Sequence, residues 1–337
     1  MTIIRLDGAD LIAFSVVTGT SIQALAQLSA IAASGDADGE LAKALDEIGD
    51  RSGETWLHLL CLCVDIGPPR SLDKLLDHVS GMDARWFRLV LLGIGAWSWR
   101  SIVGADVIEA AAHGDESAAE ILLSDERYYG RSARAALSKI LPLSPTETQR
   151  RFVDALEAFR DTVDVEHLSA SLDQVAARID ALADTEGWWE TIEILTGYRY
   201  VAEPEALRVV VMSHLAGPGL VLAQHEDTRL IVFGNTPPGT PAERVVSLGK
   251  AISDPTRVQL LTLIRDRPSQ LGELVDATGL TRSTVHHHLR LLREAGLVSV
   301  EGNARSYRYG INQRGRSDVS TLLTELLGTR EQIGASQ

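Results

Sequence analysis

The sequence predicts a mainly α-helical protein: a large N-terminal helical domain with a small antiparallel β meander, then a C-terminal winged helix-turn-helix domain (α+β). Three observations predict this fold class. Over residues 20–197 apolar side chains recur mostly at spacings of three and four, the period of half-buried helices. Short β-branched runs separated by turn residues follow at about 207–233, as in a meander. From residue 242, amphipathic runs are followed by two short strand-like runs, the order of a winged helix.

The N-terminal domain is assigned to residues 1–234, and Met1–Leu6 is expected to form a short strand that joins the meander. Residues 11–35 carry no charge and are long enough to span a bilayer. Polar side chains crowd the middle of this run, so we expect a buried helix that is capped near Thr20 or Ser21 rather than a membrane span. Further helices are expected over residues 83–99, 147–163 and 168–184.

Charge is distributed unevenly along the chain. Residues 1–240 hold 36 acidic and 19 basic side chains, whereas residues 241–337 hold 10 acidic and 13 basic ones. Because an acidic surface repels phosphate, the N-terminal domain is not expected to contact nucleic acid, and the C-terminal one is the candidate. Cys61 and Cys63 are the only cysteines, and no basic leader precedes the first apolar residues. We therefore expect a cytoplasmic protein without a disulfide framework.

A Gly- and Pro-rich stretch, residues 235–241, is the expected linker to the C-terminal domain, residues 242–337. Helix signals follow closely: a helix over 242–252, a second that begins at Asp254-Pro255, and a third capped by Ser269. Gly279 then sits in a three-residue turn, where it can adopt the left-handed backbone conformation.

The next helix, residues 281–295, is expected to be capped by Thr281. Val285, Leu289 and Leu292 repeat at four and three and so point to the core. Polar and basic side chains remain on the outer side, where reading base edges in a major groove requires them. A two-stranded wing over 299–309 places others against phosphate or a minor groove. The candidate DNA-binding residues are Thr281, Arg282, Ser283, Thr284, His286, His287 and Arg290 on the helix, and Asn303, Arg305 and Arg308 on the wing.

The sequence offers no catalytic, cofactor or metal site, so we expect no enzyme and no cofactor. His286 to His288 are consecutive and face different directions on a helix, so they cannot close one metal site. Gly93 and Gly95 lack the third glycine of a dinucleotide-binding loop. Cys61 and Cys63 lie two apart in an apolar run, where side chains diverge and buried cysteine usually serves packing.

The C-terminal domain resembles the ArsR/SmtB family of winged-helix regulators. The likeness covers about residues 242–312 and includes the wing that ends in Tyr309. Metal-sensing members of that family carry a cysteine pair in the helix before the recognition helix, but residues 270–277 contain no Cys or His, and the terminal helix has no His. Metal sensing at the usual sites is therefore not expected. The segments that carry the likeness are Ile252–Val258, Leu271–Leu274, Ser283–Val285, His288–Leu289 and Leu292–Val298.

The resemblance implies a homodimer, most often a repressor, whose paired recognition helices enter successive major grooves of double-stranded DNA. In that family the first and last helices of the module build the dimer. Residues 317–327 fit the second role, because Val319, Leu322, Leu323 and Leu326 form one stripe.

Two questions stay open at this point. The N-terminal domain is expected either to bind a small effector in a cleft between its helices and the meander, or only to dimerise. The winged helix has one alternative role, as a protein-interaction module that uses its apolar and His-rich face. The exposed arginines Arg282, Arg290, Arg305 and Arg308 favour DNA over that alternative.

Overall fold

The computed structural model describes residues 2–5, 11–68, 70–125, 128, 130–201, 208–215, 220–225, 227–234, 241–303, 306–313 and 321. The chain forms two compact units. The N-terminal unit comprises Met1–Arg178 and Pro204–Asn235, and the C-terminal unit comprises Ile179–Glu203 and Thr236–Gln337. This partition differs from the expected boundaries at residues 234 and 242, because residues 179–203 associate with the C-terminal segment.

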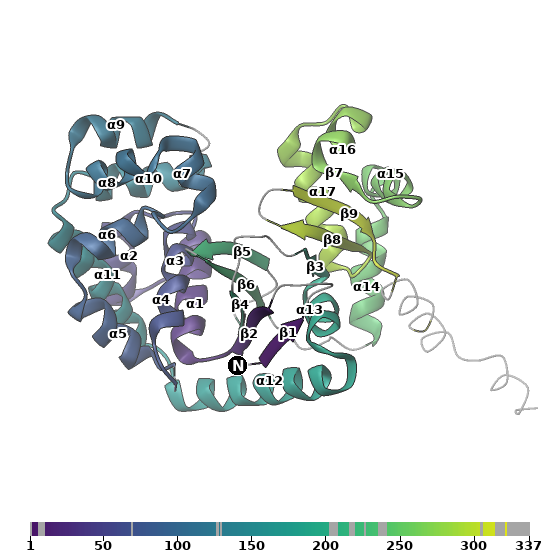
Figure 1. The fold of residues 1–337 in the computed structure, drawn as a ribbon, viewed down its shortest axis with the longest axis horizontal. Helices are drawn as coiled ribbons and strands as arrows, with labels where there is room; N and C mark the ends of the chain where they lie inside the picture. Colours follow the sequence, from purple (N-terminus) through teal and green to yellow (C-terminus); the bar gives the residue numbers. More distant parts are fainter. Residues whose placement is uncertain are drawn as a thin grey trace, which may run out of the picture. The chain divides into compact units, whose positions relative to one another are not determined.

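The N-terminal unit is largely helical (Figure 1). The expected single helix over residues 83–99 is wrong: it is interrupted by a turn in which Gly93 has a φ of 75°. The helices expected over 147–163 and 168–184 are present as α11 and α12. The helical elements are α1 (Thr20–Ser34), α2 (Gly39–Ile48), α3 (Glu54–His58), the 3-10 turn η1 (Leu59–Cys61), α4 (Leu62–Asp65), α5 (Leu72–Gly81), α6 (Ala84–Leu91), α7 (Trp97–Val103), α8 (Ala105–Ala112), α9 (Glu116–Ser124), α10 (Gly130–Ile140), α11 (Pro145–Arg160) and α12 (Val165–Glu186), which continues into the C-terminal unit.

The main core of this unit packs around α11. Phe152 of α11 meets Trp56 and Phe87, with ring centroids 4.9 and 5.6 Å apart. Arg88 is also fully buried, and its guanidinium donates hydrogen bonds to the carbonyl oxygens of Leu141 and Leu143. The cation thereby satisfies two backbone acceptors between α10 and α11 that would otherwise be desolvated without partners.

Helix α1 begins at Thr20, as the sequence predicts, but neither Thr20 nor Ser21 caps it. Gly19 is the N-cap residue. The Thr20 hydroxyl instead accepts a hydrogen bond from the amide of Leu72 at 3.0 Å, and the Ser21 hydroxyl donates to the carbonyl of Arg70 at 3.1 Å. These two side chains therefore attach α1 to the start of α5.

A five-stranded sheet completes the N-terminal unit, in the order β1-β2-β4-β6-β5. The expected antiparallel meander is wrong in one respect: β4 pairs in parallel with both β2 and β6, and antiparallel pairing is confined to β1–β2 and β5–β6. The described residues of β4 and β6 are buried almost throughout, which is typical of parallel strands covered on both faces. The strands are β1 (Thr2–Arg5), β2 (Leu11–Val17), β4 (Arg208–His214), β5 (Leu220–His225) and β6 (Thr228–Gly234).

The C-terminal unit is a winged helix with one additional helix and strand. Its sheet has the order β3-β8-β9-β7. The dimerisation helix expected over 317–327 lies outside the described residues, apart from Thr321. The elements are α13 (Trp188–Thr196), β3 (Tyr198–Tyr200), α14 (Pro241–Ile252), α15 (Pro255–Ile264), β7 (Ser269–Gln270), α16 (Leu271–Thr278), α17 (Arg282–Glu294), β8 (Val298–Asn303) and β9 (Ser306–Ile311).

Within the described ranges, none of the helices combines the length and the apolar character that a membrane crossing needs.

Candidate nucleic-acid interface

Helices α16 and α17 form the helix-turn-helix. The turn is made by Gly279, which has a φ of 69° and donates its amide to the carbonyl of Val275 at 2.9 Å; the predicted left-handed glycine is confirmed. The predicted cap of α16 is wrong, because Ser269 is buried in β7 opposite Tyr309. Helix α16 has Gln270 as its N-cap residue instead, and the carboxylate of Glu273 accepts a hydrogen bond from the amide of Gln270 at 2.7 Å.

Thr281 caps α17 as predicted. Its hydroxyl oxygen accepts a hydrogen bond from the amide of Thr284 at 3.3 Å, and it also lies 2.8 Å from the Thr284 hydroxyl and 3.0 Å from that of Ser283. Three of the candidate hydroxyls are thus gathered at the helix N-terminus. The partial positive charge of that terminus favours an anion such as a phosphate.

The two faces of α17 divide as the sequence predicts. Val285, Leu289 and Leu292 are buried and hold the helix against α15 and α16. Arg282, His286, His287 and Arg290 are exposed on the outer side, whereas His288 is half-buried. The structure therefore presents the candidate side chains of α17 to solvent, except for the half-buried Thr284, and their contact with DNA stays a prediction.

The exposed cations of α17 act on one another. The guanidinium of Arg290 lies 3.4 Å from Nδ1 of His287 and 3.8 Å from the carboxylate of Glu294. Partial burial lowers the pKa of His286, and the positive charges of Arg293, Arg290 and Arg282 lower it further. The lowered pKa favours the neutral form of His286, which offers this face one hydrogen-bond donor and one acceptor. The guanidinium groups supply the positive charge of the face.

The wing carries the rest of the candidate residues. Arg308 is exposed on β9, opposite Glu301 of β8. Asn303 ends β8 and pairs with Ser306, but its side chain is not described, and Arg305 lies outside the described residues. Of the three wing candidates, the structure therefore presents the side chain of Arg308 alone.

A third strand on the wing was not anticipated from the sequence. β3 pairs in parallel with β8, so that Tyr198 lies opposite Val300 and Tyr200 opposite Gly302. The amide of Val300 donates to the carbonyl of Gly197 at 2.8 Å, and the buried hydroxyl of Tyr198 donates to the carbonyl of Gly302 at 2.5 Å. The signal available was the alternation of Tyr198, Arg199 and Tyr200 directly after a helix-ending glycine.

Gly302 is the tightest point of the wing. Its φ is 150°, and a Cβ placed there would lie 2.0 Å from the carbonyl oxygen of Ser306. No other residue fits without moving one of the two strands, because the contact is with backbone.

Helices α14 and α15 pack against α17, and hydrogen bonds fix the junction between them. Asp254 caps α15 by accepting from the amide of Arg257 at 3.0 Å, and this hydrogen bond is the main reason why the pKa of Asp254 is lowered. The guanidinium of Arg257 donates to the carbonyls of Ala251 at 2.5 Å and Lys250 at 2.7 Å. These bonds satisfy the C-terminal carbonyls of α14 and fix its angle to α15.

The cysteines and histidines that could suggest other chemistry do not gather. Cys61 and Cys63 are buried in the N-terminal unit, where burial raises the pKa of both thiols, that of Cys63 to about 12. Among the described side chains, no group of three His, Cys, Asp or Glu residues is arranged to hold a metal ion.

Comparisons with known proteins match part of the chain. A family model described as "Bacterial regulatory protein, arsR family" matches residues 254–300. The HTH-type transcriptional regulator NmtR of Mycobacterium tuberculosis is 33% identical over 107 residues, which cover 30% of this chain and 87% of NmtR. CmtR of the same species, also an HTH-type transcriptional regulator, is 42% identical over 64 residues, or 19% of this chain and 54% of CmtR; the match thus spans about half of that relative. The solved structure of HlyU from Vibrio cholerae N16961 is 28% identical, with 26% of this chain and 97% of HlyU covered and a TM-score of 0.22.

Proposed function

Because the chain belongs to the ArsR family of bacterial regulatory proteins, we propose that it represses transcription by binding a specific double-stranded DNA site as a homodimer. Its relatives NmtR and CmtR are transcriptional regulators, and SdpR of Bacillus subtilis, 30% identical over 63 residues, is a transcriptional repressor. Repression as the direction of control is supported by these names. This function requires no enzymatic activity.

The observation that carries the proposal is the outer face of α17. Arg282, His286, His287 and Arg290 are exposed on a helix that is capped at Thr281 and anchored by a buried apolar side. In this arrangement α17 enters the major groove, Arg282 and Arg290 contact base edges or phosphates, and the wing with Arg308 lies on the backbone or in the minor groove. Asn303 and Arg305 are assigned to the same wing contact on the sequence alone.

The homodimer and the role of the N-terminal unit are further parts of the proposal. Two copies of α17 read two half-sites, as the symmetry of a dimer requires. The acidic N-terminal unit either adds surface to the dimer or binds a small effector that changes the affinity for DNA. In either role it stays off the DNA, because its charge repels phosphate.

The test begins with the DNA site itself. The full-length protein is used to select its preferred sequence from a random duplex library, and affinity is then measured by fluorescence anisotropy between about 50 and 200 mM salt. Arg282→Ala with Arg290→Ala is expected to abolish the preference for the selected sequence over random duplex. Arg308→Ala is expected to weaken binding to both alike. Removing one phosphate interaction lowers the slope of log affinity against log salt by about 0.9, or about 1.8 for two copies in a dimer.

A matched control removes the same charge elsewhere. Lys43→Ala with Arg51→Ala also deletes two cations, from exposed ion pairs with Glu40 and Asp46 in the N-terminal unit. This variant should keep the affinity, the preference and the salt slope of the unmodified protein. If the α17 double variant behaves like this control, the assignment of the reading face is wrong. If the unmodified protein binds no duplex even at low salt, the protein-interaction role replaces DNA binding.

A further inference from the structure

A row of basic side chains runs along one side of α17. Arg282, His286 and Arg293 follow one another at spacings of four and seven, which places them in one stripe on the helix. The stripe borders the buried face, because Leu289 lies next to it on the helix and is 1% exposed. Arg282 and His286 are candidate DNA-binding residues, and Arg293 is a further member of the same row.

This row lies beside the wing. Burial raises the pKa of Tyr309 on β9, and the positive charges of Arg293 and Arg282 oppose the rise, so both guanidinium groups are near the phenol. Helix α17 packs against β8, and Tyr309 is the buried partner of Val300 of β8. The row therefore lines the junction between α17 and the wing, together with Tyr309.

The aliphatic part of Arg293 packs against the turn between α13 and β3. Gly197 ends α13 with a φ of 63°, and a Cβ placed on it would lie 3.4 Å from Cγ and 3.9 Å from Cδ of Arg293. The carbonyl of the same glycine accepts from the amide of Val300 at 2.8 Å. One turn therefore contacts both α17 and the wing, and it restricts the conformations that are open to the Arg293 side chain.

The guanidinium of Arg293 forms no ion pair or hydrogen bond with another described residue. The side chain is half-buried, and burial lowers its pKa. The carboxylate of the adjacent Glu294 lies 3.8 Å from Arg290 instead. A cation that loses hydration without gaining a partner is unfavourable for folding, and such groups concentrate at functional sites.

The position of this cation suits a phosphate of the DNA backbone. When α17 enters a major groove and the wing lies on the neighbouring minor groove, one sugar–phosphate strand runs between them, because that strand separates the two grooves. A guanidinium and a phenol both donate hydrogen bonds that phosphate oxygens accept. We propose that Arg293 and the hydroxyl of Tyr309 bind one phosphate of this strand, a contact that rests on the proposed function.

The contact positions α17 without reading the sequence. Phosphates are alike at every base pair, so Arg293 should add affinity for all duplexes equally. Its expected effect thereby differs from that of Arg282 and Arg290, whose joint removal should abolish the preference for the selected sequence.

Arg293→Gln in the full-length protein tests the contact, because it removes the charge and keeps a polar side chain on the packed stem. Fluorescence anisotropy measures the affinity for the selected duplex and for random duplex between about 50 and 200 mM salt. We expect both affinities to fall about tenfold for each copy, as on loss of a hydrogen bond to a charged group. The slope of log affinity against log salt should fall by about 0.9 for each copy, and Arg293→Lys should restore most of it.

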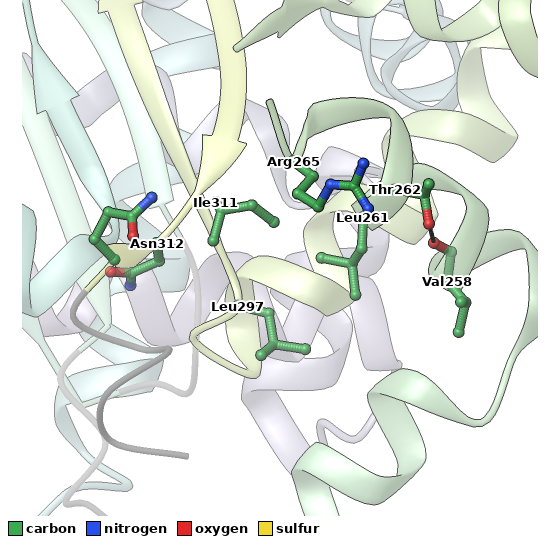
Figure 2. A pocket seen from close by; sticks show the side chains of 8 residues that line it. Val258, Leu261, Thr262, Arg265, Leu297, Ile311 and Asn312 are labelled. Atoms are coloured by element: carbon green, nitrogen blue, oxygen red, sulfur yellow. Dashed lines mark hydrogen bonds between the residues drawn. The ribbon is translucent and has the colours of Figure 1, made fainter. Parts of the chain in front are cut away.

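The matched control, Arg265→Gln, removes a cation from the same unit. Figure 2 shows Arg265 on α15, beside a hollow that Leu261 and Leu297 also line, and none of the described lining residues belongs to α17. Arg265 forms an exposed ion pair of 3.0 Å with Asp266. This variant should bind as the unmodified protein does. If Arg293→Gln matches the control, the phosphate contact is wrong, even where the double variant of α17 upholds the proposed function. If the unmodified protein binds no duplex, both fail.

Thermal melting distinguishes this role from a structural one. Because the guanidinium has no partner, Arg293→Gln should melt at the same temperature as the unmodified protein or higher. A lower melting temperature with an unchanged salt slope would make Arg293 a structural residue and overturn the contact.

Duplexes in which single phosphates are replaced by neutral methylphosphonate locate the partner. At one position in each half-site, the replacement should weaken the unmodified protein about tenfold but leave Arg293→Gln unaffected, with a smaller effect of the same kind in Tyr309→Phe. Losses that add at every position contradict a direct contact. Inorganic phosphate in place of chloride, at equal ionic strength, tests the other source of this anion. If it raises the melting temperature of the unmodified protein but not of Arg293→Gln, while the duplex losses add, the site binds a free phosphate and the choice of DNA is overturned.

Discussion

Acid should destabilise the N-terminal unit through His58 and His214. His58 packs against Trp99, with ring centroids 4.3 Å apart, and burial lowers its pKa from 6.5 to about 4. The attraction of Asp50 opposes this shift but is the smaller effect; the Asp50 carboxylate also accepts hydrogen bonds from the backbone and hydroxyl groups of Ser52 and Thr55. His214 ends β4, and burial lowers its pKa to about 4 as well.

The sign follows from proton uptake. Below pH 6.5 an unfolded histidine binds a proton that the folded unit does not accept until the pH approaches 4, so the free energy of unfolding falls as the pH falls through this window. One pH unit corresponds to about 1.4 kcal/mol for each histidine. The fall from 6.5 to about 4 therefore removes about 3 kcal/mol for each, and both together give a slope of about 2.7 kcal/mol per pH unit near pH 5.

Urea unfolding followed by tryptophan fluorescence, at pH 7.5, 5.5 and 4.5, measures this slope. His58→Gln should reduce it by about half, because one of the two proton-linked groups is gone. The control, His167→Gln, changes an exposed histidine on α12 and should leave the slope unaltered. An identical pH dependence in His58→Gln and the unmodified protein would show that His58 does not titrate as its surroundings indicate.

Two substitutions test the attachment of the wing to β3 and the internal geometry of the wing independently. Tyr198→Phe removes the hydroxyl that donates to the carbonyl of Gly302 and should cost about 0.5 to 1.5 kcal/mol of stability, the net contribution of one hydrogen bond, because the amide of Val201 still donates to the same carbonyl at 2.9 Å; thermal melting checks this, and an unchanged melting temperature refutes it. Gly302→Ala places a Cβ 2.0 Å from the Ser306 carbonyl, so we expect the wing to shift and affinity for all duplexes to fall, while the helical circular dichroism is retained. Full affinity in Gly302→Ala would mean that the wing makes no contact with DNA.

Local signals were enough for the helix-turn-helix. Asp254-Pro255, Gly279 and Thr281 each have a residue type that favours one backbone position, and the structure places each of them there. Ser269 shows the limit of such signals. A serine before a helix favours a cap, but the pairing of β7 with β9 draws it into a strand, and the cap moves to the next residue.

Long-range pairing accounts for the other differences. Val16 of β2 lies opposite Val211 of β4, and Tyr198 lies opposite Val300. Separations of this size leave no trace in local periodicity, so the parallel register of the N-terminal sheet and the third strand of the wing could not be predicted. Two local hints were available: the near-continuous apolar run of β4, because parallel strands lack the alternation of a half-exposed meander, and the alternation of Tyr198, Arg199 and Tyr200 that marks β3 as a strand without naming its partner.

The origin of β3 has a consequence for any protease that cuts within residues 235–241. Such a cut separates β3 from β8 in the covalent chain, because Tyr198–Tyr200 then belongs to the N-terminal fragment and Val298–Asn303 to the C-terminal one, but the two strands remain paired. The two fragments should therefore stay associated until denaturant separates them. A winged helix prepared without residues 179–203 would instead display the bare backbone of β8, an open strand edge of the kind that recruits other chains into aggregates.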